Sequence, residues 1–472
     1  MSGETLTRTE HDLLGDHDVP AEAYYGVHTA RALENFPITG VPISRHPDLV
    51  VALASVKQAA AEANRELGQL DPEIADAIIA ACTEIRDGAL HDQFVVDQIQ
   101  GGAGTSTNMN ANEVIANRAL EILGHERGDY QRLHPLEHVN LGQSTNDVYP
   151  TAVKVAVGMA ARALEMALRG LADRCAVKAA EFHDLLKLGR TQLQDAVPMT
   201  LGQEFGAFAV TITEDADRLG EALLLIAEIN LGGTAIGTGL NTHPLYAALV
   251  CDRLRRITGL PLITAGNLVE ATSDVGAFVQ LSGVTKRAAV KLSKICNDLR
   301  LLSSGPRAGF GEINLPAVQA GSSIMPGKVN PVIPEVVNQV AFEVIGNDLT
   351  ITLAAEAGQL QLNAFEPIIA RALLSSLNHL TAAVDVLGAR CIQGITANPE
   401  RMRDAVLQSA SIATALSPIL GYEASTALVA EAIATGASIP ELVRRGALVD
   451  EETLARLFSP ENLCRPNDPV DD

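Results

Sequence analysis

The stretch Thr272–Leu302, TSDVGAFVQLSGVTKRAAVKLSKICNDLRLL, decides the fold class of this 472-residue chain. Its apolar residues recur three and four positions apart, and they are Val275, Phe278, Val279, Leu281, Val284, Ala288, Leu292 and Ile295. Charged residues such as Lys286 and Lys291 fall outside that series. This spacing predicts one long α-helix with a wide apolar stripe along one side.

Four more stretches have the same character, so the predicted architecture is a bundle of five long helices. They are Thr151–Lys187, Leu201–Leu231, Glu335 to about Leu362, and Pro367 to about Ala389. Shorter helices are predicted for Leu49–Glu66 and Pro72–Asp87. Consecutive helices of this length pack as an antiparallel bundle. We therefore expect an all-α fold with a mixed, mainly helical N-terminal domain (1–141), a central bundle (142–398) and a small helical C-terminal domain (399–472).

The amino-acid composition disfavours some classes of binding partner. Lys and Arg total 35 against 57 Asp and Glu, a net charge of −22, which disfavours nucleic acid and anionic membrane surfaces. Charged residues make up 19% of the chain, below the ~25% of an average globular domain. We therefore expect part of the protein surface to be buried in contacts between subunits. Aromatic residues are scarce at 3%, which favours packed helices over a β-sandwich.

The cysteines and the lengths of the apolar runs indicate a protein of the reducing cytoplasm. The six cysteines are scattered without a metal-binding spacing, which predicts free thiols in a reducing cytoplasm and no structural metal. No uninterrupted apolar run approaches the ~18 residues that cross a bilayer, and the start MSGETLTRTEHDLLGD lacks the apolar core of a secretory signal.

Four segments rich in hydroxyls and carboxamides interrupt the helices: 98–112, 140–151, 189–203 and 303–335. The first contains GGAGTSTN, and its Asn110 and Glu113 are spaced as a capping box, which predicts a helix start there. The second contains Ser144, Thr145 and Asn146, followed by Pro150 in the first turn of a long helix. The third carries Thr191 and Gln192 in a helix–helix turn. For the first segment alone, a capped helix start explains the residues better than ligand binding does. For the second and third, capping and turn chemistry explains them about as well as ligand binding.

The fourth segment is more specific because it sets two serines, a lysine and an asparagine in a glycine-hinged loop, Gly321–Pro331 (GSSIMPGKVNP). A loop of about 30 residues inside a compact domain is usually functional or disordered. Its apolar residues, predicted to anchor it, are Phe310, Ile313, Leu315, Ile324 and Met325. We therefore predict a mobile functional loop.

The order of the helices separates these segments. In an up-and-down bundle, 189–203 and 303–335 lie at one end, whereas 140–151 enters the first helix from the other end, about 50 Å away. The polar segments cannot then meet within one chain. They can meet if antiparallel subunits pack side by side, which predicts a homo-oligomer with composite sites.

At these motifs the sequence resembles the fumarase/aspartase superfamily over nearly its whole length. GSSIMPGKVNP (321–331) resembles the signature loop of that superfamily, whose pattern is highly specific. The segments GAGTSTNMN (102–110), QSTND (143–147) and GRTQLQDAVPMT (189–200) resemble its other site regions. YYGVHT (24–29), ENF (34–36), QSTN (143–146) and GQLQLN (358–363) are closer to the aspartase branch than to the fumarase branch.

The resemblance implies an all-α homotetramer with a core of twenty helices, five from each chain, and sites built from three subunits. It also implies reversible, cofactor-free deamination of L-aspartate to fumarate and ammonia. Two alternatives stay open: a fumarate hydratase or another fumarate-forming carbon–nitrogen lyase, and, more remotely, a non-catalytic helical scaffold. The hydroxyl and cationic residues of the signature loop, which a scaffold would be expected to lose, are present.

By the same resemblance, Ser322 is the general base that takes the Cβ proton, and Asn146 orients the amino group. The two substrate carboxylates are held by further substrate-binding residues, which are Thr105, Ser106, Ser144, Thr145, Thr191, Gln192, Ser323, Lys328 and Asn330. Fumarases have a Thr-His pair where this chain has Thr191-Gln192. Because ammonia leaves without a general acid, Gln192 favours an ammonia-lyase, although some aspartases carry His there.

Overall fold

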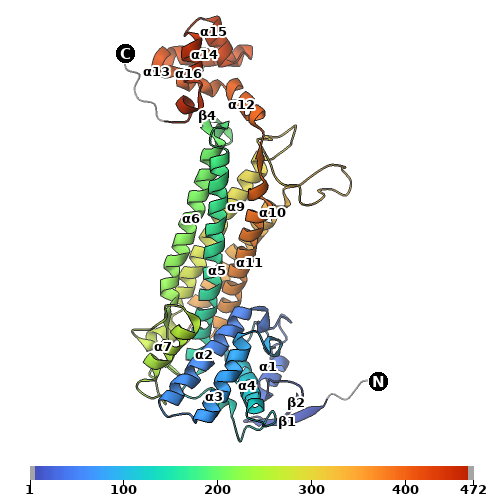
Figure 1. Cartoon of the computed structure of the whole chain (residues 1–472), viewed down its shortest axis with the longest axis vertical. Coiled ribbons are helices and arrows are strands. Elements are labelled where there is room, and N and C mark those ends of the chain that lie inside the picture. Colours follow the sequence, from blue (N-terminus) through green and yellow to red (C-terminus); the bar gives the residue numbers. More distant parts are fainter. Residues whose placement is uncertain (1–5, 466–472) are drawn as a thin grey trace. The chain divides into compact units, whose positions relative to one another are not determined.

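Five long helices dominate the computed structural model, which describes residues 6–465 (Figure 1). They are α5 (Thr145–Glu181), α6 (Leu201–Ile226), α9 (Gly276–Leu302), α10 (Val332–Glu356) and α11 (Glu366–Arg390). All five predicted long helices are thus confirmed, and so is the all-α fold class. The longest, α5, has 37 residues and so measures about 55 Å.

The chain divides into two units, and each of the long helices passes from one to the other. Unit 1 contains the described residues up to Met166, Ala216–Ala289 and Phe342–Thr381. Unit 2 contains Ala167–Asp215, Val290–Ala341 and the described residues from Ala382 onward. The division into domains 1–141, 142–398 and 399–472 stays a prediction.

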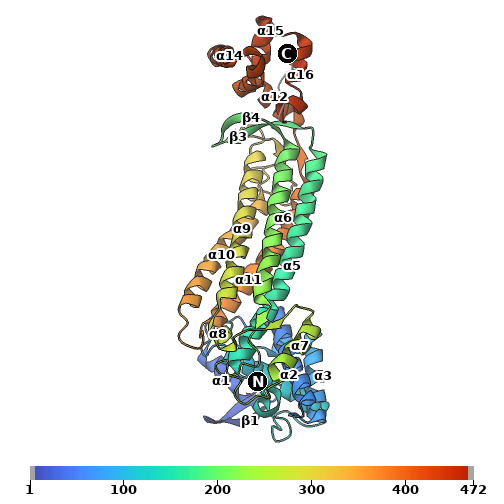
Figure 2. The same cartoon turned by 90° about the vertical axis from the view of Figure 1, so that its left-hand side faces the viewer.

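Unit 1 combines the smaller N-terminal elements with α7 and α8, both of which are labelled in Figure 2. Its strands are β1 (Thr7–Asp12) antiparallel to β2 (Gly15–Pro20), and β5 (Glu228–Ile229) parallel to β6 (Ile263–Thr264). Its helices are α1 (Val27–Asn35), α2 (Pro47–Glu66), α3 (Pro72–Arg86), α4 (Thr105–Ile122), α7 (Tyr246–Thr258) and α8 (Leu268–Ser273), with a π-helical turn at Pro135–Val139.

Unit 2 contains a β-hairpin and a cluster of short helices. The hairpin pairs β3 (Leu186–Thr191) with β4 (Gln194–Thr200), and β7 (Ile313–Asn314) pairs with β8 (Thr396–Ala397). The short helices are α12 (Pro399–Gln408), α13 (Ser417–Leu420), α14 (Tyr422–Thr435), α15 (Ile439–Arg445), α16 (Glu451–Leu457) and α17 (Pro460–Leu463). They enclose an apolar core that includes Leu416, Leu442 and Val443.

Polar contacts inside each unit show that α9 and α10 run antiparallel, as Figure 2 also shows. In unit 1, Ser282 donates to Asp348 at 2.7 Å. In unit 2, Asn338 donates to the Ser293 hydroxyl at 2.8 Å. The residue number rises along α9 while it falls along α10, as in the predicted up-and-down bundle.

The boundaries of α5 differ from the prediction at both ends. The helix begins at Thr145 instead of Thr151, so Pro150 lies inside it. Proline has no N–H to donate to the carbonyl four residues earlier, that of Asn146. The side-chain amide of Asn230 donates to that carbonyl at 3.0 Å and so replaces the missing bond. At the other end, α5 stops at Glu181, because Leu186–Thr191 pairs as β3.

One stretch, Glu366–Gly394, is long and apolar enough to span a membrane by length and composition alone. In the structure 56% of its most apolar window is buried, as in the core helix of a folded domain. The six cysteines are free, as predicted, and five of them are buried.

The capping box predicted from Asn110 and Glu113 is wrong, because α4 begins five residues earlier, at Thr105. Both side chains are buried inside the helix and cap other segments instead. The Asn110 amide oxygen accepts from Val95 N–H at 2.9 Å. The Glu113 carboxylate accepts from the N–H groups of Gly26, His28 and Thr29 and from the Thr29 hydroxyl, at 2.6–3.2 Å.

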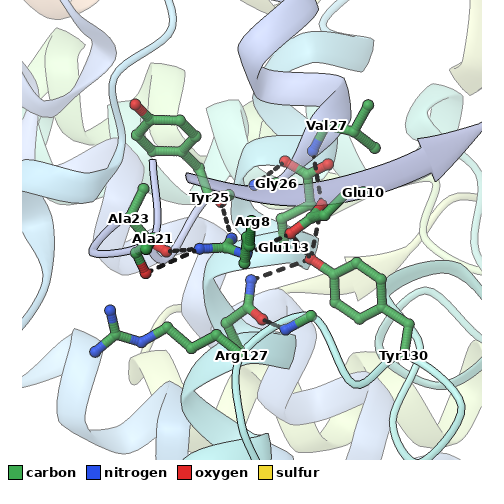
Figure 3. A network of polar contacts seen from close by, with 12 residues as sticks. Arg8, Glu10, Ala21, Ala23, Tyr25, Gly26, Val27, Glu113, Arg127 and Tyr130 are labelled. Carbon is green, nitrogen blue, oxygen red and sulfur yellow. Dashed lines mark hydrogen bonds and ion pairs between the residues drawn. The ribbon is translucent and has the colours of Figure 1, made fainter. Parts of the chain in front are cut away.

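This carboxylate belongs to a polar network that holds the start of α1 (Figure 3). Glu10 accepts from Val27 N–H at 2.9 Å and pairs with Arg8 at 2.8 Å. Tyr130 donates to Glu10 at 3.2 Å. Burial raises the pKa of Glu113 to about 7, although its hydrogen bonds act in the opposite direction.

We expect Glu113→Ala to destabilise unit 1. The substitution leaves three backbone N–H groups without their acceptor, and each unpaired buried donor costs about 1–3 kcal/mol, so a loss of at least about 3 kcal/mol is expected. Chemical denaturation followed by circular dichroism measures it. The exposed Glu126, changed to Ala, is the control and should stay within about 0.5 kcal/mol of the wild type. Equal curves for the two variants would contradict the structural role of Glu113.

Candidate functional site

The starts of α4 and α5 meet in unit 1. Gly104, the residue before α4, has φ of +90°, which favours glycine. A Cβ there would lie 2.4 Å from the Tyr149 ring on α5, so glycine also permits the close approach of the two helices. Thr105 and Ser106 form the first turn of α4, where N–H groups and the helix dipole favour an anion.

A hydrogen bond joins this turn to the Ser144–Asn146 segment. The Nδ2 of Asn108 donates to Thr145 Oγ1 at 3.1 Å and to Asn140 Oδ1 at 3.2 Å. Since Thr145 Oγ1 accepts from Asn108, its own proton is left to donate elsewhere. Ser144 Oγ likewise accepts from Asn146 N–H, at 3.2 Å. Both hydroxyls are thereby oriented as donors, which suits an anionic ligand.

Asp147 fixes the same segment from within the protein. Its carboxylate accepts from the N–H groups of Ser144, Gly232 and Thr234 at 2.9–3.0 Å. Burial raises the pKa of Asp147 to about 6, and the three backbone hydrogen bonds oppose that shift. The Asn146 Nδ2 donates to the Ala235 carbonyl at 2.7 Å. The amide oxygen and the second Nδ2 hydrogen of Asn146 are then left for a ligand.

A buried lysine completes this part of the site. Lys57 on α2 is fully buried, and its ammonium donates to Asn140 Oδ1 at 2.8 Å and to Gln143 Oε1 at 3.0 Å. Burial lowers the pKa of Lys57 to about 7, and the nearby Asp147 carboxylate acts against that shift.

In unit 2, the predicted helix–helix turn at 189–203 is a β-hairpin. Thr191 ends β3, and the two residues at the tip, Gln192 and Leu193, have φ of +54° and +62°. Two central residues with positive φ make a type I′ turn, which normally carries Asn or Gly. Side chains longer than these are strained in that conformation, and such strain is concentrated at functional sites.

A cluster of buried charges ties this hairpin to the segment before the signature loop. Glu312, which is 1% exposed, pairs with Arg190 at 2.6 Å and with Lys187 at 3.1 Å. Lys187 also pairs with Glu204 at 2.6 Å. The Arg190 guanidinium stacks on the Phe310 ring, 4.1 Å from its centroid.

The signature loop is closed by its own backbone. Gly321 N–H donates to the Lys328 carbonyl at 2.9 Å, and the Asn330 amide donates to the Gly321 carbonyl at 2.5 Å. A Cβ on Gly321 would lie 2.5 Å from the Lys328 carbonyl oxygen. Inside this closure, Ser322 Oγ accepts from the N–H groups of Ile324 and Met325, at 3.2 and 2.9 Å.

The predicted apolar anchors of this loop divide into two groups. Ile313 is buried, and Phe310 and Leu315 are half-buried, so these three hold the stem as expected. For Ile324 and Met325 the prediction is wrong within a single chain, because both are exposed at the tip. The tip also carries the exposed Ser323 and Lys328.

The sequence-predicted site residues therefore form two groups. Unit 1 holds Thr105, Ser106, Ser144, Thr145 and Asn146, and unit 2 holds Thr191, Gln192, Ser322, Ser323, Lys328 and Asn330. Sequence patterns alone did not single out the polar side chains behind the first group, which are the buried Lys57, Asn108 and Asp147 and the half-buried Asn140 and Gln143. A signal was present, because Lys57 lies four residues after Leu53 and seven after Val50, on the apolar side of its helix.

Comparison with known proteins identifies the class. Residues 15–346 match the family model described as lyase, and residues 412–465 match the model described as fumarase C C-terminus. The chain therefore belongs to the fumarase/aspartase superfamily.

The relatives and solved structures narrow this further. The chain is 59% identical over 467 residues to an aspartate ammonia-lyase of Pseudomonas fluorescens, with 99% of this chain and 98% of that protein covered. It is 54% identical over 460 residues to the aspartate ammonia-lyase of Escherichia coli K12, with 97% and 96% covered. A fumarate lyase:delta crystallin of Brucella melitensis, solved with bound cobalt, is 56% identical with a TM-score of 0.95, covering 98% of this chain and 100% of that one. A class II fumarase of Schistosoma mansoni is 36% identical with a TM-score of 0.91, covering 96% and 98%.

We expect Glu312→Gln to loosen the hairpin. The amide keeps the shape of the side chain but leaves Arg190 and Lys187 without their shared anion, and breaking a buried ion pair costs about 3–5 kcal/mol. Two measurements test it: chemical denaturation, and the rate of tryptic cleavage after Arg190 under native conditions. The exposed Glu400, changed to Gln, serves as the control. If Glu312→Gln and the control are cleaved equally slowly, the cluster does not hold the hairpin.

Proposed function

We propose that the chain is a carbon–nitrogen lyase that converts L-aspartate reversibly to fumarate and ammonia. The observation that carries this proposal is the Ser322 hydroxyl oxygen accepting two backbone hydrogen bonds inside the signature loop. The high identity to aspartate ammonia-lyases over almost the whole chain supports the choice of substrate.

The first group of site residues binds the substrate in this proposal. The Thr145 and Ser144 hydroxyls donate to a carboxylate, because each oxygen already accepts from within the protein. Thr105 and Ser106 add the N-terminal turn of α4, with its positive dipole end. The Asn146 amide oxygen accepts from the substrate ammonium, and one Nδ2 hydrogen holds the side chain in place on the Ala235 carbonyl.

The second group supplies the base and the remaining donors. Ser322 as an alkoxide takes the Cβ proton, and the Ile324 and Met325 N–H groups stabilise the charged oxygen before the reaction. The exposed Lys328 adds positive charge. Thr191, Gln192, Ser323 and Asn330 donate to the carboxylates, in positions set by the hairpin tip and the loop closure.

The bonds change in two steps. Ser322 removes the Cβ proton, and the electron pair of the broken C–H bond moves into the β-carboxylate to give an aci-carboxylate with one more negative charge. Donors already oriented toward that carboxylate stabilise the new charge. The electron pair then returns to form the Cα–Cβ double bond, the Cα–N bond breaks, and neutral ammonia leaves. Because ammonia needs no general acid, the neutral Gln192 suffices where a hydratase requires one.

We also propose that the two groups belong to sites shared between subunits of a homotetramer. The two groups belong to different units of the chain: Thr145 begins α5 in unit 1, and the hairpin follows α5 in the sequence and lies in unit 2. Along α10 in unit 1, Phe342, Ile345, Leu349 and Leu353 form an apolar stripe of which 39–63% of each side chain is exposed. An apolar stripe of this size is typical of an interface, and unit 2 has its own exposed apolar residues, Ile324 and Met325.

The compartment in this proposal is the cytoplasm, where thiols stay reduced. The unpaired state of all six cysteines supports it.

We expect Ser322→Ala to abolish turnover without loss of binding. Removing a general base typically lowers kcat by about 10²–10⁴-fold. The assay follows fumarate by its ultraviolet absorbance, with L-aspartate and malate supplied separately, and Ser303→Ala is the control outside the loop closure. A kcat near that of the wild type would remove Ser322 as the base. Rapid turnover of malate with none of aspartate would instead identify a hydratase.

Shared sites predict complementation between two inactive variants. Ser322→Ala and Thr145→Val damage different groups, so mixed tetramers recover sites in which both groups are intact. Random assembly after denaturation and refolding of an equal mixture should restore activity to about a quarter of the wild-type value. Light scattering should give about 200 kDa, four times the 49.7 kDa chain. A fully active species of 49.7 kDa would refute the shared sites.

A further inference from the structure

Lys57 is a buried cation that the proposed chemistry does not use. Its ammonium is fully buried on α2, in a stretch of alanine, valine and leucine, and it makes two hydrogen bonds to neutral amide oxygens. Burying an unpaired charge costs several kcal/mol, so a buried lysine held only by amides needs an explanation.

The network leads from this ammonium to the site. Asn140 Oδ1 accepts from Lys57 at 2.8 Å and from the amides of Asn108 and Asn112 at 3.2 Å. Asn108 in turn donates to Thr145 Oγ1 at 3.1 Å. The second contact of Lys57, Gln143 Oε1, lies on the residue just before Ser144. Lys57 is thus two side chains away from a hydroxyl that faces the proposed substrate.

The direction of these hydrogen bonds determines which way the Thr145 hydroxyl donates. Lysine can only donate, so Asn140 must present its oxygen to Lys57 and to Asn108. Asn108 then donates to Thr145, and the Thr145 proton is free for a carboxylate. In a low-dielectric interior the positive charge also polarises each donor along the chain. A neutral residue at position 57 would remove both the fixed direction and the charge.

We propose that Lys57 is a positioning residue of the substrate-binding site, which orients Asn140, Gln143 and Thr145 and supplies buried positive charge for binding a dicarboxylate. This role rests on the proposed function and assigns a task to a residue that does not touch the substrate. An acidic chain of net charge −22 needs such local charge to bind a dianion.

The charge state of Lys57 makes the role measurable. The ionisable groups that face it are Asp147 on α5 and the buried Cys82 thiol on α3, whose pKa is raised to about 12 by burial; Tyr246 on α7 faces Asp147. With a pKa lowered to about 7, Lys57 loses its proton as the pH rises through neutrality. A bound dianion favours the protonated form, so binding above about pH 7 should take up protons.

The test compares Lys57→Met with Lys154→Met. Lys154 is also buried in unit 1, but its ammonium donates to the Glu228 carbonyl, away from the network, so it is a matched control. We expect Lys57→Met to raise KM for L-aspartate and the inhibition constant of succinate by about tenfold or more, the loss of a charge-assisted interaction, with a smaller change in kcat. The control should change both constants less than twofold.

Calorimetry in two buffers of different ionisation enthalpy adds a readout that a purely structural role would not move. The wild type and Lys154→Met should take up protons on binding succinate at about pH 8, and Lys57→Met should not. If Lys57→Met does not fold, Asn140→Asp gives the answer. The new carboxylate still accepts from Lys57 and Asn108, but its negative charge cancels that of the Lys57 ammonium. The variant should therefore lose more affinity for the dianion succinate than for the monoanion butyrate.

The outcomes separate the two claims. A wild type that releases no fumarate from L-aspartate refutes the proposed function. A wild type that releases fumarate, together with a folded Lys57→Met of unchanged KM and inhibition constant, refutes the role of Lys57 alone. Equal weakening of succinate and butyrate by Asn140→Asp would also refute it.

Discussion

The hydrogen bond from Asn108 to Thr145 is the contact on which the arrangement of the first group of site residues depends. It joins the first turn of α4 to the start of α5, and it decides which way the Thr145 hydroxyl donates. A hydroxyl is both donor and acceptor, so a site built from hydroxyls has no fixed polarity until each oxygen is given an internal donor. Asn108 gives Thr145 that donor, and the backbone of Asn146 gives one to Ser144. In the signature loop, the N–H groups of Ile324 and Met325 likewise donate to the Ser322 oxygen.

Buried charges hold the turns that carry these hydroxyls. Asp147 gathers three backbone N–H groups around the Ser144–Asn146 segment, and Glu113 gathers three around the start of α1. Glu312 does the same for the hairpin through two cations. A buried charge is costly to desolvate and contributes little net stability. What it adds here is a fixed backbone conformation, because a turn that donates several hydrogen bonds to one carboxylate has few other conformations that keep all of them.

The protein combines a strongly negative net charge with a site for a dianion. Long-range attraction therefore cannot recruit the substrate, and the positive potential must be local. In the proposed function, the N-terminal end of α4 and the buried ammonium of Lys57 supply this potential in unit 1, and the exposed Lys328 supplies it in unit 2. Of the three, the Lys57 ammonium is fully buried and so shielded from solvent screening, which makes its effect on binding stronger.

The sequence by itself determined the long helices, because an apolar residue every three or four positions can be buried only on one side of a helix. It also determined where along the chain the polar segments interrupt the helices, and the signature loop indicated the superfamily. Only the tertiary structure decided that Asn110 and Glu113 cap other segments, that 186–200 is a hairpin, and that Pro150 lies within α5 with Asn230 in place of the lost bond. These features depend on donors and acceptors far apart in the chain. The role of Lys57 is of the same kind: its partners lie 83 and 86 residues away, and no local pattern encodes that distance.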